Sequence, residues 1–139
     1  MAVDFGTRRM GLAISDPEGR IVSPLKVIEA GRSMNQSARM ILAEAAEYNI
    51  GGIVIGLPLN MDGSEGPQAR LSKTLADELR RTTTLEVHLY DERLTSHAAD
   101  HLLSQRELTH KKKKARHDAV AAQVLLQSFL STQDDRSVQ

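Results

Sequence analysis

The chain has 139 residues, a length that suits one domain with a sizeable hydrophobic core. Basic and acidic residues both number 18, so the net charge is zero and no global field attracts nucleic acid or a membrane surface. The chain has no cysteine, which excludes disulfides and thiolate metal sites. Its aromatic content of 3% argues against a single-strand binder built on aromatic stacking. No signal-peptide pattern and no apolar run of the ~20 residues that span a bilayer is visible, so we expect no membrane partner.

The first thirty residues have the pattern of three short strands. Residues 2–5, 10–15 and 21–29 are apolar or alternating, and turn-forming residues separate them. The Asp-Pro-Glu-Gly tetrapeptide at residues 16–19 has strong turn chemistry. Pro24 interrupts the third strand and favours an edge position or a bend. Because the links are short, we predict an antiparallel meander.

A helical period then replaces the strand pattern. Residues 34–48 carry apolar side chains on one helical face, and Ser33 with Gln36 forms a capping-box pattern at its start. The β-branched run at residues 53–56 predicts a short strand buried on both faces.

The second half of the chain continues this alternation. In chain order we predict a helix marked by Leu71, Leu75 and Leu79, a strand over residues 85–90, a helix capped by Thr95 or Ser96 that runs through Leu103, and a last helix over residues 119–130. The order βββ-α-β-α-β-α-α predicts an α/β fold with a mixed five-stranded sheet and helices on both faces. We expect one domain over residues 1–139, with residues 134–139 as a flexible tail. The ligand site of such a sheet lies at the carboxyl ends of its strands.

An aspartate lies inside the first predicted strand. Asp4 is flanked by apolar residues, where a carboxylate is costly to bury without a partner. A metal ion is a suitable partner for a lone carboxylate at a strand end. Two further acidic positions follow far along the chain, at Asp91-Glu92 and at Asp118. If these positions meet in space, the pattern indicates a metal-dependent nuclease.

Four motifs in order carry a specific resemblance. They are DFGT at residues 4–7, GLPLNMDG at 56–63, DERLTS at 91–96 and DAVAA at 118–122. This set closely resembles the YqgF family, also called RuvX, of Holliday junction resolvase-like proteins and pre-16S ribosomal RNA nucleases. The likeness runs from Ala2 to about Leu130. It implies a ribonuclease H-like fold, a cytoplasmic bacterial protein, a two-metal nuclease centre and a role in ribosome biogenesis.

The resemblance also implies a ligand set. Asp4, Glu92 and Asp118 would be the catalytic carboxylates and would hold two Mg²⁺ or Mn²⁺ ions about 4 Å apart. Apolar residues follow Asp118 at i+3, i+4 and i+7, which predicts that it lies on the buried face near the start of the last helix.

Structural roles remain open for each acid. Asp118 could be only a helix cap, and Glu92 only a surface acid paired with Arg93. Asp91 could be the ligand in place of Glu92, since adjacent residues cannot both point inward. Asp4 could only bond the turn that follows it. For Asp62 a turn role is favoured over a ligand role.

Several polar residues are candidates for substrate binding. The loop after residue 56 could position phosphates through its backbone N–H groups. A basic stretch before Asp118 could bind a polyanion, or could be only a solvated charge run. The candidate substrate-binding residues are Thr7, Arg8, Asn60, Arg93, Lys111, Lys112, Lys113, Lys114 and Arg116.

Several functions compete on this evidence. The resemblance favours 5′-end processing of pre-16S ribosomal RNA, with ribosome precursors as partners and a monomer or homodimer as the assembly. A resolvase acting on four-way DNA would use the same acids. A non-catalytic nucleic-acid-binding factor would have kept the fold but lost catalysis. Nucleotide binding of the actin and sugar-kinase type is disfavoured because a second domain and a second phosphate motif are missing. A zinc site at His97 and His101 is disfavoured because Ala98 stands where a zinc protease has glutamate.

Overall fold

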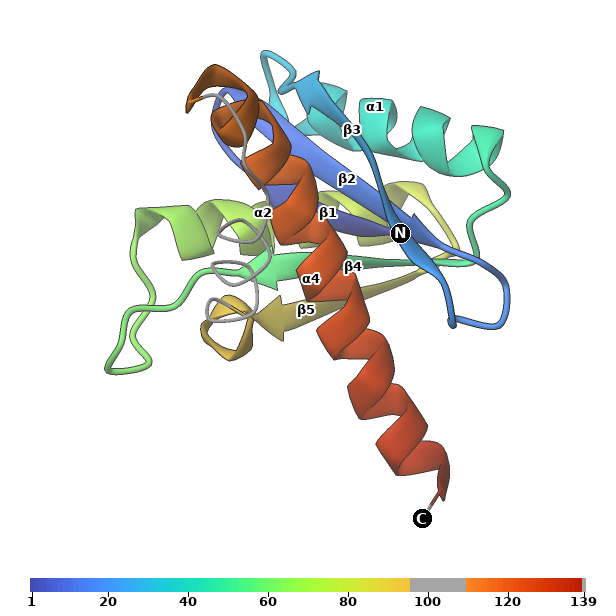
Figure 1. Ribbon diagram of the computed structural model, residues 1–139. Coiled ribbons are helices and arrows are strands. Elements are labelled where there is room, and N and C mark those ends of the chain that lie inside the picture. The colour runs from blue at the N-terminus through green and yellow to red at the C-terminus, as the bar shows by residue number, and fades with distance from the viewer. Residues whose placement is uncertain (96–109, 139) are drawn as a thin grey trace.

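Five strands form one mixed sheet in the computed structural model. They are β1 (Ala2–Phe5), β2 (Arg9–Ser15), β3 (Val22–Glu29), β4 (Gly52–Leu57) and β5 (Glu86–Asp91). Their order across the sheet is β3-β2-β1-β4-β5 (Figure 1). The structure describes residues 1–95 and 110–138, and within the last helix it describes the side chains of residues 119–133.

Within the described residues, three α-helices and one 3-10 helix connect or cover these strands. They are α1 (Met34–Glu47), α2 (Pro67–Thr82), the 3-10 helix η1 (Glu92–Leu94) and α4 (His110–Val138). The predicted α/β class, the antiparallel meander and the helix-linked strands that follow it are confirmed. The helix predicted through Leu103 lies largely outside the described residues, and η1 precedes it.

The start of α1 follows its predicted capping chemistry with one difference. The Ser33 hydroxyl accepts a hydrogen bond from the Gln36 N–H at 3.1 Å, which satisfies a free donor of the first turn. The Gln36 side chain accepts from the N–H of Arg32 at 2.7 Å, one residue before the cap. The reciprocal arrangement therefore fixes the entry into the helix, as the sequence indicated.

Strand direction brings three carboxyl ends to one edge of the sheet. β1 pairs antiparallel with β2 but parallel with β4, and β4 pairs parallel with β5. β4 occupies the position beside β1, because the connection through α1 returns the chain parallel to β1. A side chain after β5 must therefore cross β4 to reach β1.

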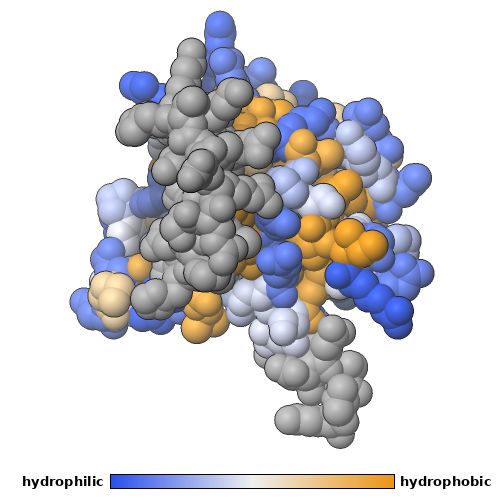
Figure 2. All heavy atoms as spheres, in the orientation of Figure 1, coloured by the Kyte–Doolittle hydropathy of each residue, from blue (hydrophilic) through white to orange (hydrophobic). Residues whose placement is uncertain are grey.

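The helices cover the two faces of the sheet unequally. α1 and α2 pack on one face, where Val3 and Ile55 belong to the main apolar cluster. α4 crosses the other face, where its Ala122 and Leu125 pack with Ala2 and Val54 (Figure 1). Apolar side chains remain visible beside α4 over the edge strand β3 (Figure 2). Because side chains alternate along a strand, Asp4 shares the α4 face with Ala2.

The last helix is longer than predicted at both ends. It begins at His110 rather than at residue 119, and it continues to Val138 through the residues expected to form a flexible tail. Asp118 therefore lies about two turns inside α4, so the predicted position near a helix N-terminus was wrong. The cause is compositional: lysine and arginine are good helix formers, but they give no apolar period to detect. None of the described helices combines the length and apolarity needed to cross a membrane.

The packing of α4 on the sheet generates a stability prediction. Leu125 is 2% exposed, so Leu125→Ala is expected to lower the free energy of unfolding by about 2–4 kcal/mol, through lost burial and the cavity left behind. Urea unfolding measures this change. The matched control is Gln127→Ala, an exposed position two residues on, which is expected to change it by less than about 0.5 kcal/mol. Equal effects of the two substitutions would contradict the observed packing of α4 on the sheet.

Candidate active site

Two of the three predicted carboxylates meet at the carboxyl edge of the sheet. Asp4 is the third residue of β1, and Glu92 is the first residue after β5. The side chains of Asp4 and Glu92 are joined by a hydrogen bond. Residues separated by most of the chain are thus brought into direct contact by the parallel arrangement of β1, β4 and β5.

A glycine in the intervening strand makes this contact sterically available. A Cβ atom built on Gly56 of β4 would lie 2.8 Å from Cγ and Cδ of Glu92, closer than real Cβ atoms approach. Any larger residue at position 56 would therefore collide with the Glu92 side chain. The sequence patterns placed Gly56 at the end of a predicted strand and at the start of the loop motif, but they gave its missing side chain no role. A glycine inside a buried β-branched strand is a signal of close approach, and that signal was available.

The acid pair perturbs the ionisation of Glu92. Burial, followed by the charge of Asp4 and the hydrogen bond to it, raises the pKa of Glu92 to about 8, with a smaller contribution from Asp91. Two carboxylates in hydrogen-bond contact cannot both ionise cheaply, so one of them keeps a proton when no cation is present. A raised pKa of this size marks the pair as a candidate functional site.

The neighbouring acid, Asp91, is directed elsewhere. Its carboxylate accepts from Arg93 Nε and Nη2, at 3.0 and 2.7 Å to Oδ2, and from the Arg93 backbone N–H at 3.0 Å. This ion pair holds the pKa of Asp91 below its usual value. Of the two adjacent acids, Glu92 therefore faces Asp4, while Asp91 neutralises an arginine.

The acid pair lines a cavity of about 390 Å³. Its lining residues are Asp4, Pro58, Leu59, Met61, Glu92, Arg93, Thr95 and Ala121. Ala121 shows that α4 closes one side of the cavity. The third predicted acid, Asp118, lies in α4 three residues before Ala121, and its side chain is outside the described part of the chain.

The donor set fits a divalent cation. Among the described side chains, no group of three histidine, cysteine, aspartate or glutamate residues converges, so the described donors are the two carboxylates of Asp4 and Glu92. Mg²⁺ takes oxygen ligands and keeps several waters, so few protein carboxylates are needed to bind it. A cation between Asp4 and Glu92 would also replace the shared proton and remove the repulsion.

The loop after β4 is a preorganised turn. The Asn60 carbonyl accepts from the Gly63 N–H at 2.8 Å, and the Asn60 amide nitrogen donates to Ser64 Oγ at 2.9 Å. Asp62 accepts from the backbone N–H and the hydroxyl of Ser64 at 2.9 and 2.6 Å. Asp62 thus takes the turn role favoured by the sequence, and the Asn60 side chain serves the same turn.

The other predicted substrate-binding residues lie near the same edge or outside the described side chains. Thr7 and Arg8 are exposed in the hairpin that follows β1. Arg93 is engaged with Asp91 and donates to the Met61 carbonyl at 3.3 Å, so it ties the β5 end to the loop after β4. Lys111, Lys112, Lys113, Lys114 and Arg116 lie in the first turns of α4, and their side chains are outside the described part.

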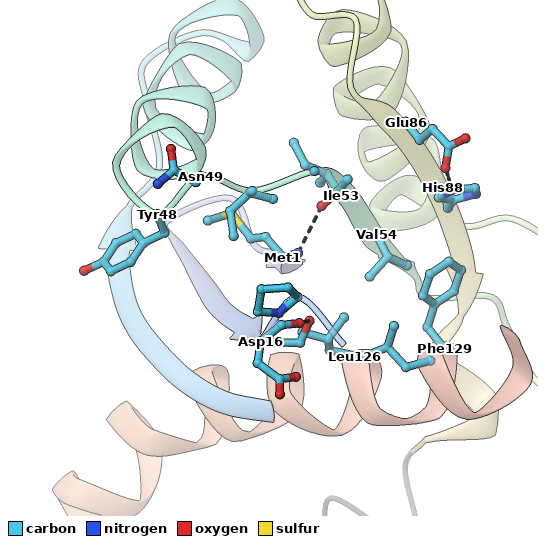
Figure 3. Close-up of a pocket in the computed structure, with 16 residues that line it drawn as sticks. Met1, Asp16, Tyr48, Asn49, Ile53, Val54, Glu86, His88, Leu126 and Phe129 are labelled. Carbon is cyan, nitrogen blue, oxygen red and sulfur yellow. Dashed lines mark hydrogen bonds and ion pairs between the residues drawn. The ribbon is translucent and has the colours of Figure 1, made fainter. Parts of the chain in front are cut away.

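A larger cavity of about 650 Å³ lies at the opposite edge of the sheet (Figure 3). There the Met1 amine donates to the Gly52 carbonyl at 3.0 Å, and burial lowers the pKa of this amine to about 6. The two acids in its lining are separately engaged, Asp16 with backbone N–H groups and Glu86 with His88. This cavity has no converging carboxylates, so size alone does not make it the better candidate for an active site.

The Gly56 contact gives a structural prediction. Gly56→Ala is expected to displace the Glu92 carboxyl from Asp4, so the pKa of Glu92 falls from about 8 towards its ordinary value of 4.5. Carbon-detected NMR titration of the side-chain carboxyl groups in a chelator measures this shift. Gly51→Ala is the matched control, because a Cβ at Gly51 meets nothing within 4 Å. An unchanged Glu92 pKa in the Gly56 variant would refute the steric argument.

The raised pKa also predicts how stability depends on pH. The folded-state pKa of Glu92 lies above its ordinary value of 4.5. The stability that protonated Glu92 contributes to the fold is therefore fully present below pH 4.5 and is lost as pH rises through about 8. The glutamine of the Glu92→Gln variant cannot ionise, so this variant avoids the loss of stability at high pH. At about pH 9 in EDTA the variant is expected to be more stable than wild type by on the order of 2 kcal/mol, and at about pH 4 the difference disappears. Urea unfolding across this pH range measures it, with Glu47→Gln at an exposed position of α1 as control.

Comparisons with known proteins agree with the fold and with the predicted enzyme class. A relative from Roseiflexus sp. (strain RS-1), named "Putative pre-16S rRNA nuclease", is 40% identical, and the match covers 96% of this chain and 94% of the relative. A relative of the same name from Rhodopirellula baltica is 43% identical, and the match covers 93% of this chain and 74% of the relative. The crystal structure of the fowlpox virus Holliday junction resolvase aligns with a TM-score of 0.55 at 13% identity, over 94% of this chain and 96% of that one, which supports the fold alone. These names agree with the enzyme class predicted from the motifs. The model of the family described as "RuvX: Holliday junction resolvase" matches residues 1–132, and the chain belongs to this family.

Proposed function

We propose that this protein is a divalent-metal-dependent nuclease that hydrolyses phosphodiester bonds. Asp4, Glu92 and Asp118 are its catalytic, metal-holding carboxylates. The observation that carries the proposal is the contact between Asp4 and Glu92, two acids from distant parts of the chain held together in a cavity. Such a pair is unfavourable for folding and is suited to binding a cation.

The roles of the protein groups follow from their surroundings. A bound Mg²⁺ or Mn²⁺ ion would neutralise the phosphate and lower the pKa of a bound water. Asp4, fixed within β1, and Glu92, fixed across Gly56, supply oxygen ligands whose positions do not depend on a mobile loop. The proton carried by Glu92 leaves when the cation binds, so cation affinity rises with pH towards about 8.

The substrate we propose is precursor ribosomal RNA, cleaved in 5′-end processing of pre-16S RNA. The names of the relatives support this choice. The basic residues at the start of α4, Lys111 to Lys114 with Arg116, would contact phosphates on the α4 side of the cavity. The candidate binding surface is completed by polar residues around the same edge of the sheet, namely Thr7, Arg8, Asn60 and Arg93. Ribosome precursors in the cytoplasm would then be the partners.

A second candidate substrate is four-way DNA. The description of the matched family as a Holliday junction resolvase favours it specifically. The same carboxylates would serve either substrate. Paired cleavage of a junction needs two sites related by symmetry, whereas RNA processing is open to a monomer.

The test compares Asp4→Asn with wild type. Cleavage of end-labelled pre-16S RNA, and in parallel of a four-way DNA junction, is measured with Mg²⁺, with Mn²⁺ and in EDTA. We expect wild-type cleavage to require the metal, and Asp4→Asn to lower the rate by at least ~10²-fold because a cation ligand is lost. Asp77→Asn, an exposed acid on α2, is the matched control and is expected to cleave like wild type.

Three outcomes would change the proposal. Cleavage of the DNA junction alone would replace the RNA substrate. Equal cleavage by wild type and Asp4→Asn would remove the acid pair from the chemistry. Binding of RNA by a folded wild type that never cleaves with either metal would favour a non-catalytic nucleic-acid-binding factor.

A further inference from the structure

An exposed methionine borders the carboxylate site. Met61 is 91% exposed, yet it lines the same cavity as Asp4 and Glu92. Leu94, on η1 two residues after Glu92, is 67% exposed. Apolar surface is visible at the lower left of Figure 2, in the region of the loop after β4 and of η1. Single exposed apolar residues are common, so it is the position of Met61 on the wall of this cavity that calls for a role.

The position of Met61 is fixed by its surroundings. Met61 follows Asn60 in the turn closed by the Gly63 N–H, and Gly63 has the positive φ of 87° that the turn requires. The Met61 carbonyl accepts from Arg93, which is itself held by Asp91. The methionine is therefore presented to solvent by a braced turn, at a set distance from the acids, rather than by a loose loop.

The chemistry of a polynucleotide explains an apolar group at this place. When a phosphate lies at the acid pair, the bases on either side of it lie near the rim of the cavity. In a paired helix those bases are stacked and hidden, whereas an unpaired base exposes an apolar face. A thioether is polarisable and packs well on aromatic rings, and apolar wedges beside base steps are a known means of holding unstacked bases.

We propose that Met61 packs against an unpaired nucleobase next to the scissile phosphate and makes the enzyme select strands that are unpaired at the point of cleavage. The inference rests on the proposed nuclease function and adds a specificity-determining residue to it. It also assigns a role to the braced turn, since a mobile loop would not hold the methionine against one base.

The test measures binding separately from cleavage. Two RNA duplexes of the same sequence are compared, one fully paired and one with a short bulge that carries 2-aminopurine. Titrations in Ca²⁺, with the probes checked to remain intact, give a dissociation constant for each probe. We expect wild type to prefer the bulged probe and Met61→Ser to lose threefold to tenfold in affinity for it alone, about the strength of a thioether–ring contact.

Two control variants sharpen the result. Met61→Leu keeps an apolar side chain and is expected to retain most of the preference. Ile21→Ser removes an apolar side chain that is 68% exposed in the turn between β2 and β3, and it is expected to bind like wild type. The 2-aminopurine fluorescence change on binding should be reduced in Met61→Ser and unchanged in Ile21→Ser.

The outcomes separate this inference from the function on which it rests. Retention of the full preference by Met61→Ser, or an equal loss in Ile21→Ser, overturns the role of Met61 while metal-dependent cleavage by wild type still supports the nuclease. Failure of wild type to bind either probe or to cleave RNA or junction DNA overturns both proposals.

Discussion

The repulsion between Asp4 and Glu92 is the constraint on which the rest of this site depends. Two carboxylates in contact inside a cavity destabilise the fold unless one is protonated or a cation lies between them, and the raised pKa of Glu92 expresses that cost. A sequence selected for stability alone would not hold such a pair. The surrounding elements can be understood as the structure that keeps these two acids together.

Three features of the sheet maintain the contact. Parallel pairing of β1, β4 and β5 brings their carboxyl ends to one edge. Gly56 leaves the space through which Glu92 reaches across β4 to β1. The Arg93–Asp91 ion pair then turns the neighbouring acid away and links the β5 end to the turn that carries Met61. α4 packs over the same face and contributes Ala121 to the cavity wall, so the cavity is built from β1, the loop after β4, the segment after β5 and α4.

These arrangements also show why charge counts alone gave little information about function. The net charge is zero, and several charged side chains serve the protein itself. Arg93, which the sequence suggested for substrate binding, is committed to Asp91 and to the loop after β4. Asp62 and Asn60 shape a turn. The exposed side chain of Met61, which lines the same cavity as the two acids, is a feature that polar motifs do not reveal.

The sequence by itself determined the local elements and the identity of the candidate acids. The strand and helix periods, the Ser33 cap and the four ordered motifs indicated the fold class, the family and the candidate acids Asp4 and the adjacent Asp91 and Glu92, because these signals depend on residues near one another in the chain. The sequence did not determine that β4 separates β1 from β5 or that α4 begins at His110. It also did not show that the Glu92 side chain lies over Gly56, where a Cβ atom would collide with it. Strand order and close approach are set by packing between distant segments, and a run of lysines has no apolar period. The tertiary structure alone decided which of the two adjacent acids faces Asp4, because that choice follows from the Arg93 ion pair and the space above a glycine.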